Sequence, residues 1–347
     1  MKCQLLLIFT LATTCVGAQD KSLSYGASLI SELQYNLSNK DQDVPKWANL
    51  LALDAELKTD RWWKNGMFKA SFWSIRNSFD RPIAKDHLIF SNIDAKSHLL
   101  LCSALGYEHR FGRFMVFGGI RDVNIDYFTT PCDLFFTNSS AGITPTISLN
   151  YKAAVYPMAA MGIHMEYSSD NFVFMNSFYN NLKGVNEDNI FQFGFNPVKN
   201  GYVNFSQVEY SANSGIYYLG WVMEKTPERN FRYSTYISAE KNIARFSGSV
   251  LRAASKIGYT PQKDHYCRTY LGSGVILSNL LEDNEKDRLG LMLVYADLAD
   301  DDELAAELTY VIELFPSVYL QPALHFIKHT KMNELLGLLR VTVNLNH

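Results

Sequence analysis

The feature that most constrains this chain is an alternation of apolar and polar residues, which recurs in segments of about ten residues along the sequence. The alternation is clearest over 303–315, where one apolar row consists of Leu304, Ala306, Leu308, Tyr310, Ile312 and Leu314. The residues between them form a mixed row that contains two carboxylates, Glu307 and Glu313. Because successive side chains of a strand point to opposite faces, this stretch is predicted to be a strand with one apolar and one partly polar face.

A soluble sheet would place such an apolar face against a covering layer. The rest of the sequence offers no helical period that could supply one. We therefore predict that the strands close into a barrel whose apolar side faces lipid and whose polar side faces water.

The connections between the predicted strands alternate between long and short, as in outer-membrane barrels, whose periplasmic turns are short and whose strand number is even. The run 190–195 would make a seventeenth strand and break this alternation, so we assign it to an outer loop, 180–201. The remaining strands are 23–35, 47–57, 67–76, 99–109, 114–120, 157–167, 172–179, 202–210, 215–224, 230–239, 243–254, 265–277, 287–297, 303–314, 318–327 and 334–346. The predicted fold class is all-β, a 16-stranded antiparallel transmembrane β-barrel around a water-filled channel.

Residues 1–18 have the three parts of a secretory signal peptide, namely Lys2, an apolar core and a small-residue site that ends at Ala18. The core of roughly 14 residues is shorter than the about 20 residues that a membrane-spanning helix needs. We predict cleavage after Ala18, export to the bacterial outer membrane, and a single barrel domain over 19–347.

The composition excludes some partners and leaves others. Acidic and basic residues nearly balance, 35 against 32, so no basic face for nucleic acid can be assembled. Aromatic residues are abundant, with 20 Tyr and 22 Phe, which suits the aromatic girdles of an outer-membrane barrel. Cys102, Cys132 and Cys267 are odd in number and fit no zinc spacing, so we assign them no role and leave any disulfide pairing open. No cofactor or metal is predicted.

Three groups of segments carry a family resemblance. They are Glu307–Tyr310, Leu314–Pro316, Leu320–Ile327 and Gly337–Arg340; then Gly118–Asn124, Phe135–Ser140 and Pro145; then Tyr156–Pro157 and Ala160–Gly162. Together, and in their order along the chain, they resemble the carbohydrate-selective porin family, which comprises outer-membrane channels related to the glucose porins of Gram-negative bacteria. The sequence departs from the family pattern at Lys328-His329, where Asn-Pro is usual. The resemblance implies passive diffusion of sugars, a third outer loop (122–156) folded into the lumen and, by analogy alone, a homotrimer.

The selectivity of a porin depends on pore width and on the groups that line the constriction. If the third loop lies in the lumen, the polar groups expected at the narrowing are Arg121, Asp122, Asp126 and Asn138. Phe135 and Phe136 offer flat apolar faces to a sugar ring, but they could equally pin the loop to the barrel wall. Both interpretations stay open at this stage.

Five polar side chains point inward by strand parity: Glu166, Glu307, Gln321, His325 and Arg340. An arginine that faces lipid near the midplane costs roughly 2–4 kcal/mol, which favours the inward direction for Arg340. Most of the five are expected to solvate the wall and a minority to touch solute. His164 also points inward, as wall lining.

An acidic outer loop holds Asp297, Asp300, Asp301, Asp302 and Glu303. It is either solvated surface or a place where divalent ions bridge to lipopolysaccharide. The favoured function is a non-enzymatic channel for sugars or other small solutes. The alternatives are a structural or adhesive barrel without an open pore, and a barrel hydrolase, for which the sequence offers scattered histidines and no Gly-x-Ser-x-Gly turn.

Overall fold

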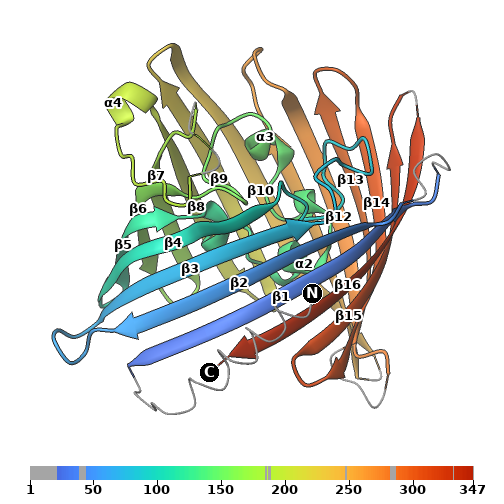
Figure 1. Ribbon diagram of the computed structural model, residues 1–347, viewed down its shortest axis with the longest axis horizontal. Helices are drawn as coiled ribbons and strands as arrows, with labels where there is room; N and C mark the ends of the chain where they lie inside the picture. The colour runs from blue at the N-terminus through green and yellow to red at the C-terminus, as the bar shows by residue number, and fades with distance from the viewer. Residues whose placement is uncertain are drawn as a thin grey trace.

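The alternating segments fold into one antiparallel sheet that closes on itself as a barrel of sixteen strands (Figure 1). The computed structural model describes residues 22–38, 44–183, 186, 189–246, 248–281, 287–330 and 332–346. The strands are β1 (Leu23–Asn36), β2 (Lys46–Lys58), β3 (Gly66–Asn77), β4 (His98–Phe111), β5 (Phe114–Arg121), β6 (Ala160–Ser168), β7 (Phe172–Asn180), β8 (Tyr202–Ala212), β9 (Gly215–Thr226), β10 (Arg229–Phe246), β11 (Ser249–Tyr259), β12 (Cys267–Ser278), β13 (Arg288–Leu298), β14 (Glu303–Phe315), β15 (Val318–Lys328) and β16 (Asn333–Asn346). The predicted fold class and strand count are confirmed.

The barrel closes where β1 pairs with β16, and Glu32 lies opposite Arg340 in this register. Because each strand pairs with its neighbours in the sequence, an even strand number brings both ends of the barrel to the side with the short turns. We call this side the turn end and the opposite side the loop end. The predicted signal peptide, 1–18, lies outside the described residues.

The two faces of the wall differ as the alternation predicts. On β14, the outward Leu304 and Leu308 are 39% and 48% exposed, whereas the inward Glu303 and Glu307 are 0% exposed. The same outward rows of exposed apolar residues recur on other strands, which is the arrangement of a transmembrane barrel. At the turn end of these rows lie exposed aromatic residues: Phe111, Phe114, Tyr167, Phe172 and Tyr210. Among the described residues, no helix is long and apolar enough to cross a membrane.

One predicted turn is wrong. The charged run Glu240–Asn242 does not end a strand, because β10 continues to Phe246 through a bulge between Asn242 and Ala244. Glu240 points inward and forms an ion pair with Arg252 on β11. The run therefore contains a polar inward residue of a strand, which local sequence does not distinguish from a turn.

Three long connections leave the loop end. The second loop joins β3 to β4 (residues 78–97), the third loop joins β5 to β6 (residues 122–159), and the fourth loop joins β7 to β8 (residues 181–201). The third loop carries η1 (Val123–Ile125), α2 (Pro131–Phe135), η2 (Ser139–Ala141) and α3 (Pro145–Ser148), and the fourth carries α4 (Pro197–Asn200). In Figure 1, α2 and α3 lie within the ring of strands. The run 190–195 is not a wall strand, as predicted.

Candidate functional site in the barrel lumen

The third loop is bound to the inner wall through Glu307 of β14. The Glu307 carboxylate accepts hydrogen bonds from the backbone N–H groups of Thr137 (2.9 Å) and Asn138 (3.0 Å). It also accepts one from the Thr137 hydroxyl (3.0 Å), and this hydroxyl lies 2.9 Å from His325 Nε2. Glu307 and His325 point inward as parity predicts, but they are 0% and 1% exposed because the loop covers them.

The two neighbouring phenylalanines of the third loop pack against wall glycines. A Cβ atom on Gly290 would lie 2.3 Å from the Phe135 ring, and one on Gly274 would lie 2.9 Å from the Phe136 ring. Only glycine leaves room for the rings at these inward positions. Gln321 also donates to the Phe135 carbonyl (3.0 Å). Phe135 and Phe136 therefore pack the loop against the wall, as one of the two interpretations of the sequence predicts, and their contact with a sugar stays a prediction.

A buried ion pair holds α2 on β11, a neighbouring part of the wall. Lys256 of β11 lies 2.5 Å from the Asp133 carboxylate and donates to the carbonyl oxygens of Ala141 and Gly142, both at 2.7 Å. The Tyr218 hydroxyl of β9 donates to the second carboxylate oxygen of Asp133 (3.0 Å). Sequence reasoning missed these residues, since nothing local links a lysine on one strand to an aspartate over a hundred residues away.

An ion pair between Arg121 and Asp126 holds the start of the third loop. The Arg121 guanidinium donates to both carboxylate oxygens of Asp126 (2.6 and 2.5 Å). His164 Nδ1 lies 3.5 Å from Asp126 and 2.7 Å from the Ser177 hydroxyl. In a hydrolytic triad the hydroxyl and the carboxylate occupy opposite ring nitrogens, whereas here both approach the same one and Ser177 is 0% exposed. This cluster is built to hold the loop, and it does not have the geometry of a nucleophilic site.

Asp122 and Asn138 are also buried, at 2% each. The Asp122 carboxylate accepts from the Asn124 backbone N–H (3.2 Å), and burial raises the pKa of Asp122 to about 8. The Asn138 side chain accepts from the backbone N–H and the hydroxyl of Ser140, at 2.9 and 2.6 Å. Both side chains therefore stabilise the loop's own turns.

The second loop also folds into the lumen, which the sequence analysis did not predict. Glu303 of β14 accepts hydrogen bonds from the backbone N–H groups of His87 (2.7 Å) and Leu88 (3.2 Å). Glu334 of β16 accepts one from the Lys85 backbone N–H (2.9 Å). Glu303 was assigned to an acidic outer loop, but it is inside the barrel and holds this loop.

A third anchor of the second loop is the ion pair of Glu32 with Arg340, which joins the first and last strands. Glu32 accepts from the Ser91 hydroxyl (2.6 Å), and Arg340 donates to the Asn92 side chain (2.6 Å). Arg340 points inward as predicted but is 6% exposed. Its charge is balanced within the wall and covered by the loop.

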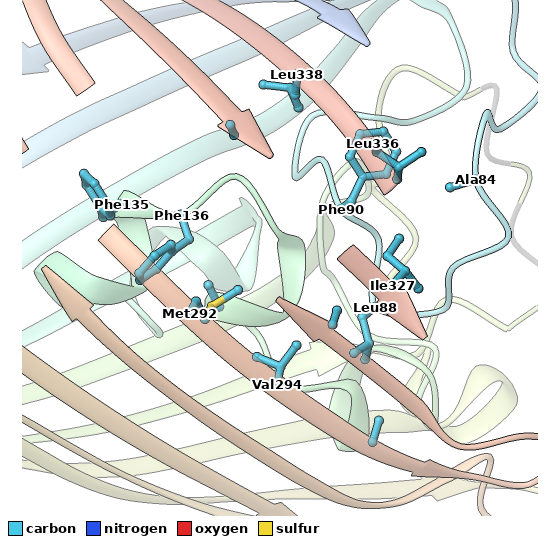
Figure 2. Packing of buried hydrophobic residues seen from close by; sticks show 14 of the residues in the cluster. Ala84, Leu88, Phe90, Phe135, Phe136, Met292, Val294, Ile327, Leu336 and Leu338 are labelled. Atoms are coloured by element: carbon cyan, nitrogen blue, oxygen red, sulfur yellow. The ribbon is translucent and has the colours of Figure 1, made fainter. Parts of the chain in front are cut away.

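Apolar packing adds to these hydrogen bonds. Figure 2 shows Leu88 and Phe90 of the second loop beside Ile327 and Leu336 of the wall, in the buried cluster that also contains Phe135 and Phe136. Ile327 and Leu336 are inward residues, at 1% and 0% exposure. Apolar side chains on the inner face of a water-filled bore need a cover, so this inward pattern was the sequence signal for a lumen loop.

The two lumen loops are bonded to each other. The Asn92 N–H donates to the Thr137 carbonyl (2.7 Å), and the Ser139 N–H donates to the Ile89 carbonyl (2.8 Å). The constriction is therefore formed by two loops, which together cover the loop-end part of the inner wall.

Of the predicted pore-lining residues, the structure leaves only Glu166 partly exposed on the inner wall. The others are covered by the loops or belong to them: Arg121, Asp122, Asp126, Phe135, Phe136, Asn138, Glu307, Gln321, His325 and Arg340. Their contact with a solute stays a prediction. Their observed contacts hold the loops against the wall or stabilise the loops' own turns.

The part of the inner wall that stays partly exposed lies near the turn end. Lys69 is placed between Glu56 (3.4 Å) and Glu108 (3.0 Å), and Arg110 also donates to Glu108 (3.2 Å). Other inward charged residues there are Glu166, Glu209, Arg252 and Arg288. Leu134, on the side of α2 away from its wall contacts, is 66% exposed.

The cysteine side chains are buried packing residues, and Cys132 and Cys267 lie in the same apolar cluster as Phe135 and Phe136. Cys102, Cys132 and Cys267 are all free and buried. Within the described ranges, no group of three or more His, Cys, Asp or Glu side chains could hold a metal ion.

These features define the class as a porin-type barrel, with sixteen antiparallel strands, an apolar outer face and loops folded into the lumen. No family model and no curated protein sequence matches the chain. Among solved structures, the chain is similar to OprB of Pseudomonas putida in its high-pH form, with 14% identity, a TM-score of 0.83 and coverage of 96% of this chain and 97% of that one. The low-pH form of that protein gives 13% identity and a TM-score of 0.66, with 97% of each chain covered. A mutant porin of Rhodopseudomonas blastica gives 11% identity and a TM-score of 0.62, with 93% of this chain and all of that one covered. The likeness shows the shared fold, which is the fold that the family resemblance implied.

Proposed function

We propose that the chain is an outer-membrane channel for passive diffusion of small solutes, with a preference for carbohydrates. The observation that carries this proposal is the construction of the bore: two loops are fixed inside it by wall side chains, and the turn-end wall remains lined by charged groups. Sixteen strands enclose a bore wide enough to be water-filled, and inward loops reduce such a bore to a selective narrowing. The fold of OprB and of the R. blastica porin supports the same function.

The preference for carbohydrates rests on the pairing of charges. Lys69 and Arg110 are balanced by Glu56 and Glu108, and Arg252 by Glu240, so these groups add little net charge while supplying many donors and acceptors. A neutral solute with many hydroxyl groups can exchange its hydrogen bonds to water for such partners. The family resemblance points to the same solute class.

The experiment is single-channel recording in planar lipid bilayers. Purified protein should give stepwise conductance, which added oligosaccharide reduces in a concentration-dependent manner. Conductance without a sugar effect would leave a channel and remove the carbohydrate preference.

A barrel with a structural or adhesive role is the second candidate, because the two loops are bonded to each other inside the bore. Zero current from protein that is folded in the bilayer would favour this candidate over the channel. A hydrolase is not supported by the arrangement of Ser177, His164 and Asp126.

The location and assembly belong to the same proposal. Residues 1–18 would direct export and be removed, and the loop end would face the outside of the cell. Asp300, Asp301 and Asp302 would then lie near lipopolysaccharide, and homotrimer formation follows by analogy with porins. Fractionation of the outer membrane and native mass spectrometry test these points.

A further inference from the structure

The wall of the barrel is incomplete beside β4. β4 has 14 residues and β5 only 8, and their pairing stops at Ala104 and Arg121, where the chain turns into the lumen as the third loop. The loop-end part of β4, residues 98–103, therefore does not pair with β5. Backbone groups exposed to lipid without a hydrogen-bond partner are costly, so a membrane barrel needs a substitute there.

The fourth loop supplies one. The Cys102 N–H donates to the Ile190 carbonyl at 3.0 Å, which places the run 189–195 beside the open edge of β4. Cys102 is 4% exposed and Ile120 is 0% exposed, although Ile120 lies in the outward row of β5. Outward apolar residues elsewhere on the barrel, such as Leu308, are about half exposed.

Two aromatic contacts place this run on the outer surface. Phe191 packs edge-on against Phe72 of β3, with ring centroids 6.3 Å apart, and Phe72 is paired with the outward, 40% exposed Leu53. At the other end, Phe195 packs edge-on against Phe178 of β7, also at 6.3 Å. The run therefore crosses the outside of the wall from β7 to β3.

The free edge of the run is apolar. Phe191, Phe193 and Phe195 are 41%, 56% and 44% exposed, and the rings of Phe191 and Phe193 stack at 5.2 Å. The Gln192 side chain between them donates to the carbonyl oxygens of Asn186 and Asn189, so its amide N–H groups are used within the loop. A contiguous apolar edge of this kind marks an interaction surface.

We propose that residues 189–195 form an external strap, which completes the wall beside β4 and inserts Phe191, Phe193 and Phe195 among acyl chains of the outer leaflet. Acyl chains are the partner because the strap is continuous with the outward apolar face through Phe72 and Phe178. Aromatic residues at the boundary of the hydrocarbon are also the usual lipid contact of such barrels. The inference requires only that the barrel lies in a bilayer and does not depend on what passes through it.

The test is a nitroxide label at Phe193→Cys in protein reconstituted into phospholipid vesicles. Two matched positions calibrate it: Leu293→Cys, outward on β13 and 53% exposed, and Val198→Cys, on α4 and 87% exposed. Collision rates are measured with oxygen, which concentrates in lipid, and with a water-soluble nickel chelate. Unsubstituted protein gives the background from the three buried cysteines.

The expected result is that the label at 193 collides mainly with oxygen, as at 293, whereas the label at 198 collides mainly with nickel. A nickel-dominated label at 193 would overturn the inference, because the strap would then lie in water. Protection from both reagents would also overturn it, because a protein surface such as a second copy would then cover the strap. Heat-modifiable migration identifies folded protein, and Phe195→Cys replaces Phe193→Cys if that variant does not fold.

Discussion

The second and third loops occupy the same lumen but are held there in different ways. The third loop is bound through the Glu307 carboxylate and is also fixed by shape and by buried charge, since Phe135 packs over Gly290 and Lys256 neutralises Asp133. The second loop is fixed by wall carboxylates, Glu303 and Glu334, that accept from its backbone, and by the ion pair of its Asp94 with Lys46 of β2, but it has no ring packed over a wall glycine among the described contacts. Both loops share β14, where Glu303 and Glu307 are four residues apart on the inner face.

The different anchoring of the two loops predicts which property of the narrowing each loop controls. Packed rings and a buried ion pair define one position, because a displaced loop would leave a cavity and an unpaired charge. Backbone hydrogen bonds to carboxylates are weaker individually and depend on the charge of the acceptor. We therefore expect the third loop to set the width of the bore and the second loop to respond to conditions.

The largest effect on the anchoring of the third loop is expected from Lys256→Met. It leaves the buried Asp133 carboxylate with the Tyr218 hydroxyl but without its cation, and removing one partner of such a pair costs about 3–5 kcal/mol. Urea unfolding in detergent micelles measures the loss in the free energy of unfolding. The control is Lys241→Met, at an exposed position of β10. Equal stability of the two variants would show that the ion pair does not hold the third loop.

Gly290→Ala tests the contribution of shape. The added Cβ atom would lie 2.3 Å from the Phe135 ring, and overpacking of this kind costs about 1–3 kcal/mol. The loop should shift away from the wall, and single-channel conductance should change relative to the unsubstituted protein. Gly118→Ala is the matched control, because a Cβ there meets no atom within 4 Å. Identical conductance and stability in the two variants would contradict the role of the wall glycines.

Glu303→Gln tests the second loop. The variant keeps the size of the side chain but removes its charge and one of the two oxygens that accept from His87 and Leu88. A buried N–H group that loses its acceptor costs about 1–3 kcal/mol. Open-channel current should show more frequent brief fluctuations, with little change in mean conductance. Glu313→Gln, which alters a carboxylate near the β14–β15 turn, should leave the fluctuations unchanged. If mean conductance changes as much as in Gly290→Ala, the two loops do not differ in the way described.

The smallest expected effect is a pH dependence of the second loop. Burial, together with the nearby Glu303, raises the pKa of Asp86 to about 7, above its ordinary value of 3.8. A raised pKa means that the neutral form is favoured inside the barrel, so its contribution to stability is present at low pH and is lost as the pH rises through 7. Fluctuations should increase between pH 6 and 8.

Asp86→Asn should remove this step and leave a smaller one near pH 8, where the raised pKa of Asp122 lies. A step near pH 7 that persists in Asp86→Asn would assign the titration to another group. The same series in Glu303→Gln shows whether the two carboxylates are coupled.

Much of the wall could be predicted from the sequence. The inward direction of Glu307, Gln321, His325 and Arg340 follows from the two-residue period of a strand. Because the apolar row faces lipid, the residues that alternate with it face the lumen. The decision to leave 190–195 out of the wall was also correct, because the alternation of long and short connections depends on chain order alone. The error at Glu240 shows the limit, since a charged inward residue of a strand resembles a turn.

The candidate site could be predicted only in part. The resemblance implied a third loop in the lumen, but it did not show whether Phe135 faces a solute or the wall. That depends on the room for a ring that Gly290 leaves by having no side chain. The entry of the second loop into the lumen was not predicted, although Leu336 and Leu338 on inward positions of β16 are buried apolar residues that need a covering segment.

The sequence by itself determined the strands, their number, their order and the face that each side chain takes, because these follow from local periodicity and neighbour pairing. The tertiary structure alone decided which segments fill the bore and which one closes the wall beside β4. Those outcomes depend on contacts between residues distant along the chain, such as Glu303 with His87, Lys256 with Asp133 and Cys102 with Ile190. Such pairs leave no periodic trace in the sequence, because each is formed only once and only after the barrel has closed.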